Sequence, residues 1–133
     1  MKWYLAIGLL LVSGCGGPAV LPVEGVVQFE DGEPVKTGVI EFRSTDGQWR
    51  GSGRLDDQGH FSITSIDGEL GLPAGMYNVI VAQMVITEDL SLEQHGHGRA
   101  VPRKYADYYT SGLEQAISEE NSKALVIELA SSP

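Results

Sequence analysis

Apolar and polar residues alternate in short segments along most of this chain, and that period of two limits the fold more than any other feature. In residues 23–30, Val23, Val27 and Phe29 fall on one face and charged or amide side chains on the other, which is typical of a half-buried strand. We expect six more strands, at residues 39–44, 48–55, 60–66, 76–85, 113–118 and 123–130. Residues 76–85 are apolar on both faces, so we expect them at the centre of the core.

Turn sequences separate most of these segments. Asp31-Gly32-Glu33-Pro34, Thr45-Asp46-Gly47 and Asp56-Asp57-Gln58-Gly59 combine residues that favour tight turns. Consecutive hairpins imply antiparallel pairing, and no helix longer than about one turn, at residues 103–109, is expected. The pattern therefore predicts an all-β fold, a seven-stranded sandwich of two antiparallel sheets over residues 23–133.

The first 14 residues have the organisation of a signal peptide. Lys2 is followed by an apolar stretch at residues 3–12, which is shorter than the roughly 20 residues that a membrane-spanning helix needs. Val12-Ser13-Gly14-Cys15 resembles the lipobox of bacterial lipoproteins, in which the cysteine is acylated and becomes the new N-terminus. Cys15 is the only cysteine, so it cannot form an internal disulfide. We expect lipidation at Cys15; an ordinary secretory signal with a chance cysteine is the alternative.

Residues 15–22 would then be the lipidated cysteine and a tether rich in Gly and Pro. Its seven residues after Cys15 reach at most about 25 Å when extended, so the domain would lie close to the bilayer. Two or three fatty chains make such attachment effectively permanent. In known lipoproteins an aspartate after the cysteine favours the inner membrane, and Gly16 stands there instead. We therefore expect a cell-envelope location and favour the outer membrane.

The strand and turn sequences also resemble a family, the carboxypeptidase regulatory-like domains, also called transthyretin-like or prealbumin-like. The resemblance spans residues 23–129 and is carried by Val23-Glu24-Gly25-Val26-Val27, Asp31-Gly32-Glu33-Pro34-Val35, Val39-Ile40-Glu41-Phe42, Asp57-Gln58-Gly59-His60-Phe61, Leu72-Pro73-Ala74-Gly75-Met76-Tyr77-Asn78-Val79, Pro102-Arg103-Lys104-Tyr105 and Thr110-Ser111-Gly112-Leu113. It implies an immunoglobulin-like or transthyretin-like β-sandwich and an accessory module without peptidase activity.

Two structural roles follow from individual residues in these motifs. Tyr77 can pack its ring inside and donate its hydroxyl to a loop carbonyl. Residues 104–107 resemble the segment that precedes the last two strands in these lipoproteins, and the resemblance implies a loop that packs as a plug over one end of the sandwich, a structural role rather than a binding one.

Charge and motif spacing argue against nucleic-acid binding and catalysis. The net charge is −9, and removing residues 1–14 takes away only the charge of Lys2, which leaves −10. Such a charge repels phosphate backbones. Ser52 lies between glycines but lacks the Gly-x-Ser-x-Gly nucleophile elbow and a placed histidine partner, and the same glycines lack the phosphate-loop pattern. We expect no enzymatic activity and no cofactor.

Two ligand-binding hypotheses remain beside a purely structural one. His95 and His97 could bind one Zn²⁺ or Cu²⁺, with Glu93 or His60 as a third ligand, but a solvated loop is the simpler explanation and we expect no metal site. Three aromatic residues could stack on a glycan or dock a peptide: Trp49, Tyr108 and Tyr109. Trp49 falls on the inward-reading face, where core packing is the simpler role.

Together these features predict a non-catalytic module of the cell envelope, tethered through a lipid on Cys15. Its role would be adhesion, scaffolding or interaction with an envelope protein, and free sheet edges would let such a partner add a strand. The alternatives are a ligand-binding module, for a glycan or a metal, and an accessory domain for an envelope enzyme supplied in trans.

Overall fold

A computed structural model describes residues 18–83 and 99–131 of the chain. These residues form ten short strands and one 3-10 helix, which confirms an all-β fold but with more strands than the seven expected. The strands are β1 (Val20–Leu21), β2 (Glu24–Phe29), β3 (Val39–Ser44), β4 (Arg50–Arg54), β5 (His60–Ser62), β6 (Thr64–Ser65), β7 (Leu72–Pro73), β8 (Gly75–Ala82), β9 (Leu113–Ile117) and β10 (Leu125–Leu129), with the 3-10 helix η2 (Arg103–Ala106) between β8 and β9.

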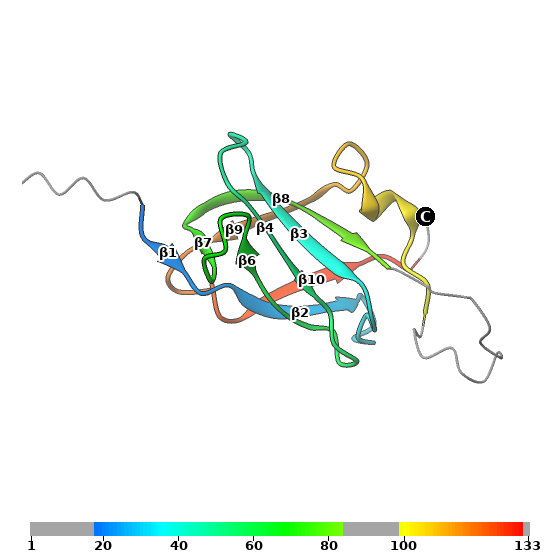
Figure 1. The fold of residues 1–133 in the computed structure, drawn as a ribbon. Coiled ribbons are helices and arrows are strands. Elements are labelled where there is room, and N and C mark those ends of the chain that lie inside the picture. Colours follow the sequence, from blue (N-terminus) through cyan, green and yellow to red (C-terminus); the bar gives the residue numbers. More distant parts are fainter. Residues whose placement is uncertain (1–17, 84–98, 132–133) are drawn as a thin grey trace, which may run out of the picture.

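Two larger sheets lie on either side of one core, in a sandwich-like arrangement (Figure 1). One has five strands in the order β6-β4-β3-β8-β9, and the other has three in the order β10-β2-β5. Phe42 of β3 and Phe61 of β5 meet across the core with ring centroids 5.9 Å apart. The inward side chains from both sheets are fully or nearly fully buried: Val27, Phe29, Ile40, Phe42, Phe61, Tyr77, Val79, Val81, Ile117, Leu125, Ile127 and Leu129. Their burial supplies the main driving force for the fold.

The segment expected as one strand at residues 60–66 is divided between the two sheets. β5 pairs with β2, whereas β6 pairs with β4. Both are edge strands of their sheets, so the chain crosses between the two edges, and the Ile63 side chain between them is buried in the core at 2% exposure. The alternation of apolar and polar residues continues through the crossing, which is why the pattern predicted a single strand.

The expectation of purely antiparallel sheets is wrong for one pair of strands. β10 runs parallel to β2, with Leu125 beside Gly25 and Leu129 beside Phe29. β9 ends at Ile117, and the following turn reaches the start of β2, where the Glu24 N–H donates to the Ser122 carbonyl at 2.8 Å. The chain therefore begins β10 at the same end at which β2 begins, and the two strands run in the same direction.

β8 is central, as expected, but only one of its faces is fully buried. Tyr77, Val79 and Val81 point into the core, whereas Asn78 and Ile80 on the other face are half-buried. The Tyr77 hydroxyl donates to the Pro73 carbonyl at 2.7 Å, which confirms its expected structural role. Burial, the main cause, raises the pKa of Tyr77 to about 12, so the hydroxyl stays a donor throughout the physiological range.

The predicted plug at residues 104–107 also packs as expected. It contains the end of η2, and Tyr105 there is 5% exposed and belongs to the core. The Tyr105 hydroxyl oxygen accepts a 2.8 Å hydrogen bond from the Ala130 N–H, just after β10. This contact fixes η2 against the end of the three-stranded sheet.

β1 was not expected as a strand, and it defines one end of the domain. It pairs with β7, Val20 beside Pro73 and Leu21 beside Leu72, so part of the expected tether belongs to the fold. Figure 1 shows β1 at one end of the molecule and η2 at the opposite end. We call the end with β1 and β7 the β1 end, and the end with η2 the η2 end.

Gly71 makes the pairing of β1 with β7 possible. Its φ is +111°, and a β-carbon there would overlap the Leu21 carbonyl oxygen. Gly68 has a comparable φ of +85°, but a β-carbon there would meet nothing within 4 Å. Gly71→Ala should therefore displace β1, whereas Gly68→Ala adds only backbone strain, of about 1 kcal/mol.

Amide exchange of the peptide covering residues 18–25 measures this difference. We expect much faster exchange in Gly71→Ala than in the native chain, and nearly native exchange in Gly68→Ala. Equal exchange in the two variants would contradict the role assigned to Gly71.

Candidate interaction surfaces

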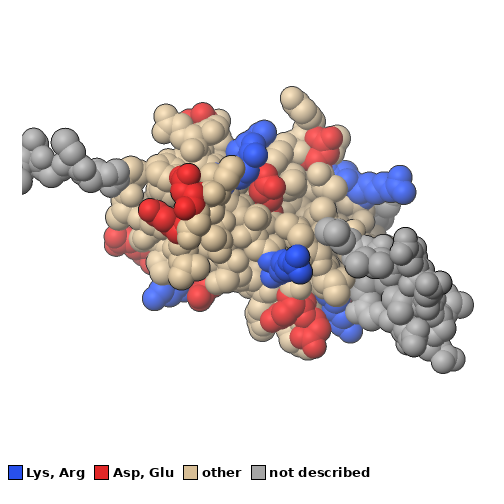
Figure 2. All heavy atoms as spheres, viewed as in Figure 1, with Lys and Arg blue, Asp and Glu red and all other residues tan. Residues whose placement is uncertain are grey.

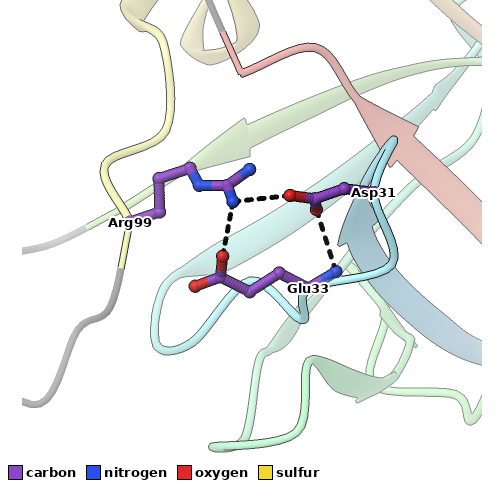
Figure 3. Close-up of polar contacts among 3 residues, drawn as sticks. All are labelled: Asp31, Glu33 and Arg99. Carbon is purple, nitrogen blue, oxygen red and sulfur yellow. Dashed lines mark hydrogen bonds and ion pairs between the residues drawn. The ribbon is translucent and has the colours of Figure 1, made fainter.

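An ion-pair cluster lies at the η2 end of the domain (Figure 3). The Arg99 Nη2 donates to Asp31 Oδ2 at 2.7 Å and to Glu33 Oε2 at 2.6 Å. The Arg99 guanidinium also lies over the ring of Phe29, 4.6 Å from its centroid, and Phe29 is a core residue. Arg99 is therefore bound by charge on one side and by a cation–π contact on the other.

The local sequence holds the two carboxylates of this cluster together. Gly32 adopts a φ of +89° in a tight turn, and its N–H donates to the Phe29 carbonyl at 2.8 Å. The Asp31 Oδ1 accepts from the Glu33 N–H at 3.1 Å. The hydrogen bond from Arg99, followed by that from Glu33, lowers the pKa of Asp31, and the Asp31 bond raises that of Arg99. The pair therefore stays ionised at neutral pH.

Gln83 fastens the neighbouring chain to the same turn. Its Nε2 donates to the Lys36 carbonyl at 3.0 Å, and its Oε1 accepts from the Val101 N–H at 3.3 Å. Gln83 and Arg99 are the described residues on either side of residues 84–98. Both are thus attached to the turn at residues 31–36. We call the cluster of Asp31, Glu33, Gln83 and Arg99 the Arg99 corner.

A second polar network lies on the outer face of the five-stranded sheet. Glu41 accepts a 2.8 Å hydrogen bond from the Tyr108 hydroxyl and lies 3.5 Å from the Arg50 Nε. Arg43 lies over the Tyr108 ring, 3.9 Å from its centroid. Burial, then the bond to Glu41, raises the pKa of Tyr108. Tyr108, a candidate for ligand stacking, is thus already engaged, whereas Tyr109 is 98% exposed.

A groove of about 490 Å³ follows the outer face of the three-stranded sheet. Val26 and Val126 are register partners there, and Val126 is 51% exposed. The polar lining residues come from three segments of the chain: Glu24, His60, Ser62 and Lys123. The only aromatic ring along the groove's described lining, besides the imidazole of His60, is that of Phe61, which is 5% exposed. The groove therefore offers little aromatic surface for sugar stacking.

Of the four residues named as possible metal ligands, the structure describes only His60. His60 is exposed at the start of β5, and its Nδ1 lies 3.6 Å from the Asp56 Oδ2. The expected tight turn before it is confirmed, since Asp56 Oδ1 accepts from the N–H groups of Gln58 and His60. Within residues 18–83 and 99–131, no group of three or more His, Cys, Asp or Glu could hold a metal ion. Glu93, His95 and His97 lie outside the described residues, as does Cys15.

The remaining candidates from the sequence lie on or near the five-stranded sheet. Trp49 is half-buried and packs against the core, as its inward-reading position predicted. Ser52 lies exposed on β4, beside Glu41 of β3. His60, the one histidine in the described part of the chain, belongs to the other sheet, so the structure does not bring it together with Ser52.

Comparison with protein-family models, curated proteins and solved structures finds no match to this chain. None of the helical segments in the described residues is both long and apolar enough to cross a bilayer. Figure 2 shows basic side chains scattered singly among acidic ones on the visible face. The surfaces therefore have to be judged on their own chemistry.

Replacing Arg99 should loosen the Arg99 corner selectively. In Arg99→Met we expect faster amide exchange at Gln83 and Val101, because both carboxylates lose their partner. Arg103→Met is the matched control, because the structure gives Arg103 no ion pair among the described residues. Exchange unchanged from the native rates in Arg99→Met would contradict the role of the cluster.

The same corner should respond to acid. A carboxylate whose pKa is lowered in the folded state stabilises the fold above the ordinary Asp range of about 4, and this contribution disappears as pH falls through the lowered value. Once rates are divided by the intrinsic exchange rate at each pH, the native protein should therefore show lower protection of Gln83 and Val101 below about pH 4 than at neutral pH, and Arg99→Met should show little additional change.

Proposed function

We propose that the chain is a non-catalytic lipoprotein module of the cell envelope, anchored through a lipid on Cys15 and binding a second envelope protein. The outer membrane is the favoured location. The finer description of the fold, an immunoglobulin-like or transthyretin-like sandwich related to carboxypeptidase regulatory-like domains, belongs to the same proposal. It is supported by the two facing sheets and by the bond of the Tyr77 hydroxyl to the Pro73 carbonyl.

The position of β1 is the observation that carries this proposal. β1 begins at Val20, five residues after Cys15, and its pairing with β7 fastens that point to the rest of the domain. A lipid on Cys15 would therefore hold the β1 end against the bilayer and direct the η2 end, with its Arg99 corner, away from it. An anchored domain with one defined outward end is suited to presenting a surface to a partner.

The chemistry of the outward surfaces favours a protein partner over a small ligand. The Arg99 corner presents one cation and two carboxylates, held together by hydrogen bonds. The side chain of each is partly exposed, 33% for Arg99, 56% for Asp31 and 40% for Glu33. Polar, preorganised rims of this kind give protein interfaces their specificity and orientation. An envelope enzyme acting in trans would be one such partner.

The first test is whether Cys15 has a lipid, measured by mass spectrometry of the N-terminal peptide. The native chain, produced in a bacterial host that processes lipoproteins, should yield an N-terminal peptide that begins at Cys15 and has the added mass of its acyl chains. Cys15→Ser should leave the protein unprocessed and without the lipid mass. An intact Met1 together with an unmodified Cys15 thiol in the native chain would contradict the proposal.

Site-specific photo-crosslinking in the same host makes the second test. With a photoreactive residue at Asp57 or Arg103, near the η2 end, we expect one discrete protein adduct that disappears in Cys15→Ser. The same residue at Gln48, at the β1 end, should give no such adduct. Equal adducts at all three positions, or none at Asp57 and Arg103, would contradict an outward-facing docking surface.

A further inference from the structure

Exposed apolar side chains gather around β7, the strand that pairs with β1. Within residues 18–83 and 99–131, five large apolar side chains are exposed, and three of them flank β7 in the sequence. Ile66 is 72% exposed and Leu70 is 78% exposed, both in the turn before β7, and Met76, just after it, is 45% exposed. Single exposed apolar residues are ordinary, but a group around one point of the fold indicates a contact surface.

The same region contains a tryptophan and the start of the described chain. Trp49, Met76 and Pro18 line one depression of about 140 Å³. Backbone hydrogen bonds join the turn at residues 45–49 to the segments on both sides of β7. The Thr45 N–H donates to the Met76 carbonyl, and the Ile66 N–H donates to the carbonyl of Arg50, which follows Trp49. We call Trp49, Ile66, Leu70 and Met76 the apolar rim.

Chain geometry places this rim beside the anchor. Three residue steps separate Cys15 from Pro18, and they span at most about 11 Å even when fully extended. A lipid on Cys15 would therefore keep Pro18, and the rim beside it, within reach of the headgroup layer. Tryptophan is enriched at this interface, and aliphatic side chains on an exposed apolar face bury beside it.

We propose that the apolar rim lies in the interface of the bilayer that holds the Cys15 lipid, so that the domain touches the membrane directly as well as through its anchor. This inference rests on the proposed lipidation of Cys15. It adds a second contact, which fixes the orientation of the domain and keeps the η2 end outward.

The charges of the rim decide which lipid surface it fits. Asp46, Asp67 and Glu69 lie in the same loops. The one cation beside them, Arg50, lies 3.5 Å from Glu41, which offsets its charge, so the rim has an excess of carboxylates. An anionic surface would repel these carboxylates, whereas zwitterionic headgroups would not. The occupant is therefore a zwitterionic phospholipid surface.

Trp49 is a built-in probe of this contact, because the only other tryptophan, Trp3, lies in the predicted signal peptide. The lipidated chain is purified, its Cys15 peptide is verified by mass, and it is reconstituted into phosphatidylcholine vesicles with bromines either near the headgroup or deep in the acyl chains. We expect the shallow bromines to remove roughly half of the Trp49 emission and the deep ones to have much less effect.

Two variants make the result specific. Ile66→Ser combined with Leu70→Ser should greatly reduce the quenching, and both side chains are exposed enough that the fold should tolerate the change. Tyr109→Ser, at another exposed position, is the matched control and should quench like the native chain. With phosphatidylglycerol added at low salt, quenching should fall, and it should recover when salt is raised.

The outcomes separate this inference from the function on which it rests. A native chain that has the lipid mass and remains in the vesicles, but whose Trp49 emission is unaffected by shallow bromines, overturns the membrane contact and leaves the anchor intact. Quenching that is equally strong in the double variant also overturns it. A Cys15 peptide without lipid overturns the anchor and the contact together.

Discussion

The pairing of β1 with β7 is the interaction on which the account of this domain depends. Val20 and Leu21 lie beside Pro73 and Leu72, and the close approach of Gly71 to the Leu21 carbonyl leaves no room for a side chain there. This short ladder ties the start of the fold to the core, because Leu72 is fully buried. Without it, the residues after Cys15 would be a loose leader, and an anchor would leave the domain without a preferred orientation.

Several parts of the fold were predictable because they depend on local chemistry. A period of two identifies a strand wherever one face is buried, as in β2, β3 and β10, and the Asp-Gly turns need little beyond their own residues. The role of Tyr77 was also predictable, because a buried phenol needs an acceptor and the carbonyls just before β8 are within its reach.

Other parts depend on contacts between distant segments, which a single sequence does not encode by pattern. Strands of two residues, such as β1 and β7, are too short to show a period, and alternation does not tell whether β10 runs parallel or antiparallel to β2. Arg99 and Asp31 are 68 residues apart, so only the folded chain shows that they pair. The exposure of Ile66 and Leu70 likewise becomes visible only once the turn between β6 and β7 is placed.

The central claim is that a lipid on Cys15 holds the β1 end of this domain directly against a bilayer. Neutron reflectometry of the native lipidated chain on a supported phosphatidylcholine bilayer measures this most directly, because it resolves the distance between headgroups and protein. If the β1 end lies against the bilayer, the protein layer should begin at the headgroups with no hydrated gap. A layer separated from the headgroups by a band of water, or no bound protein at all, would contradict it.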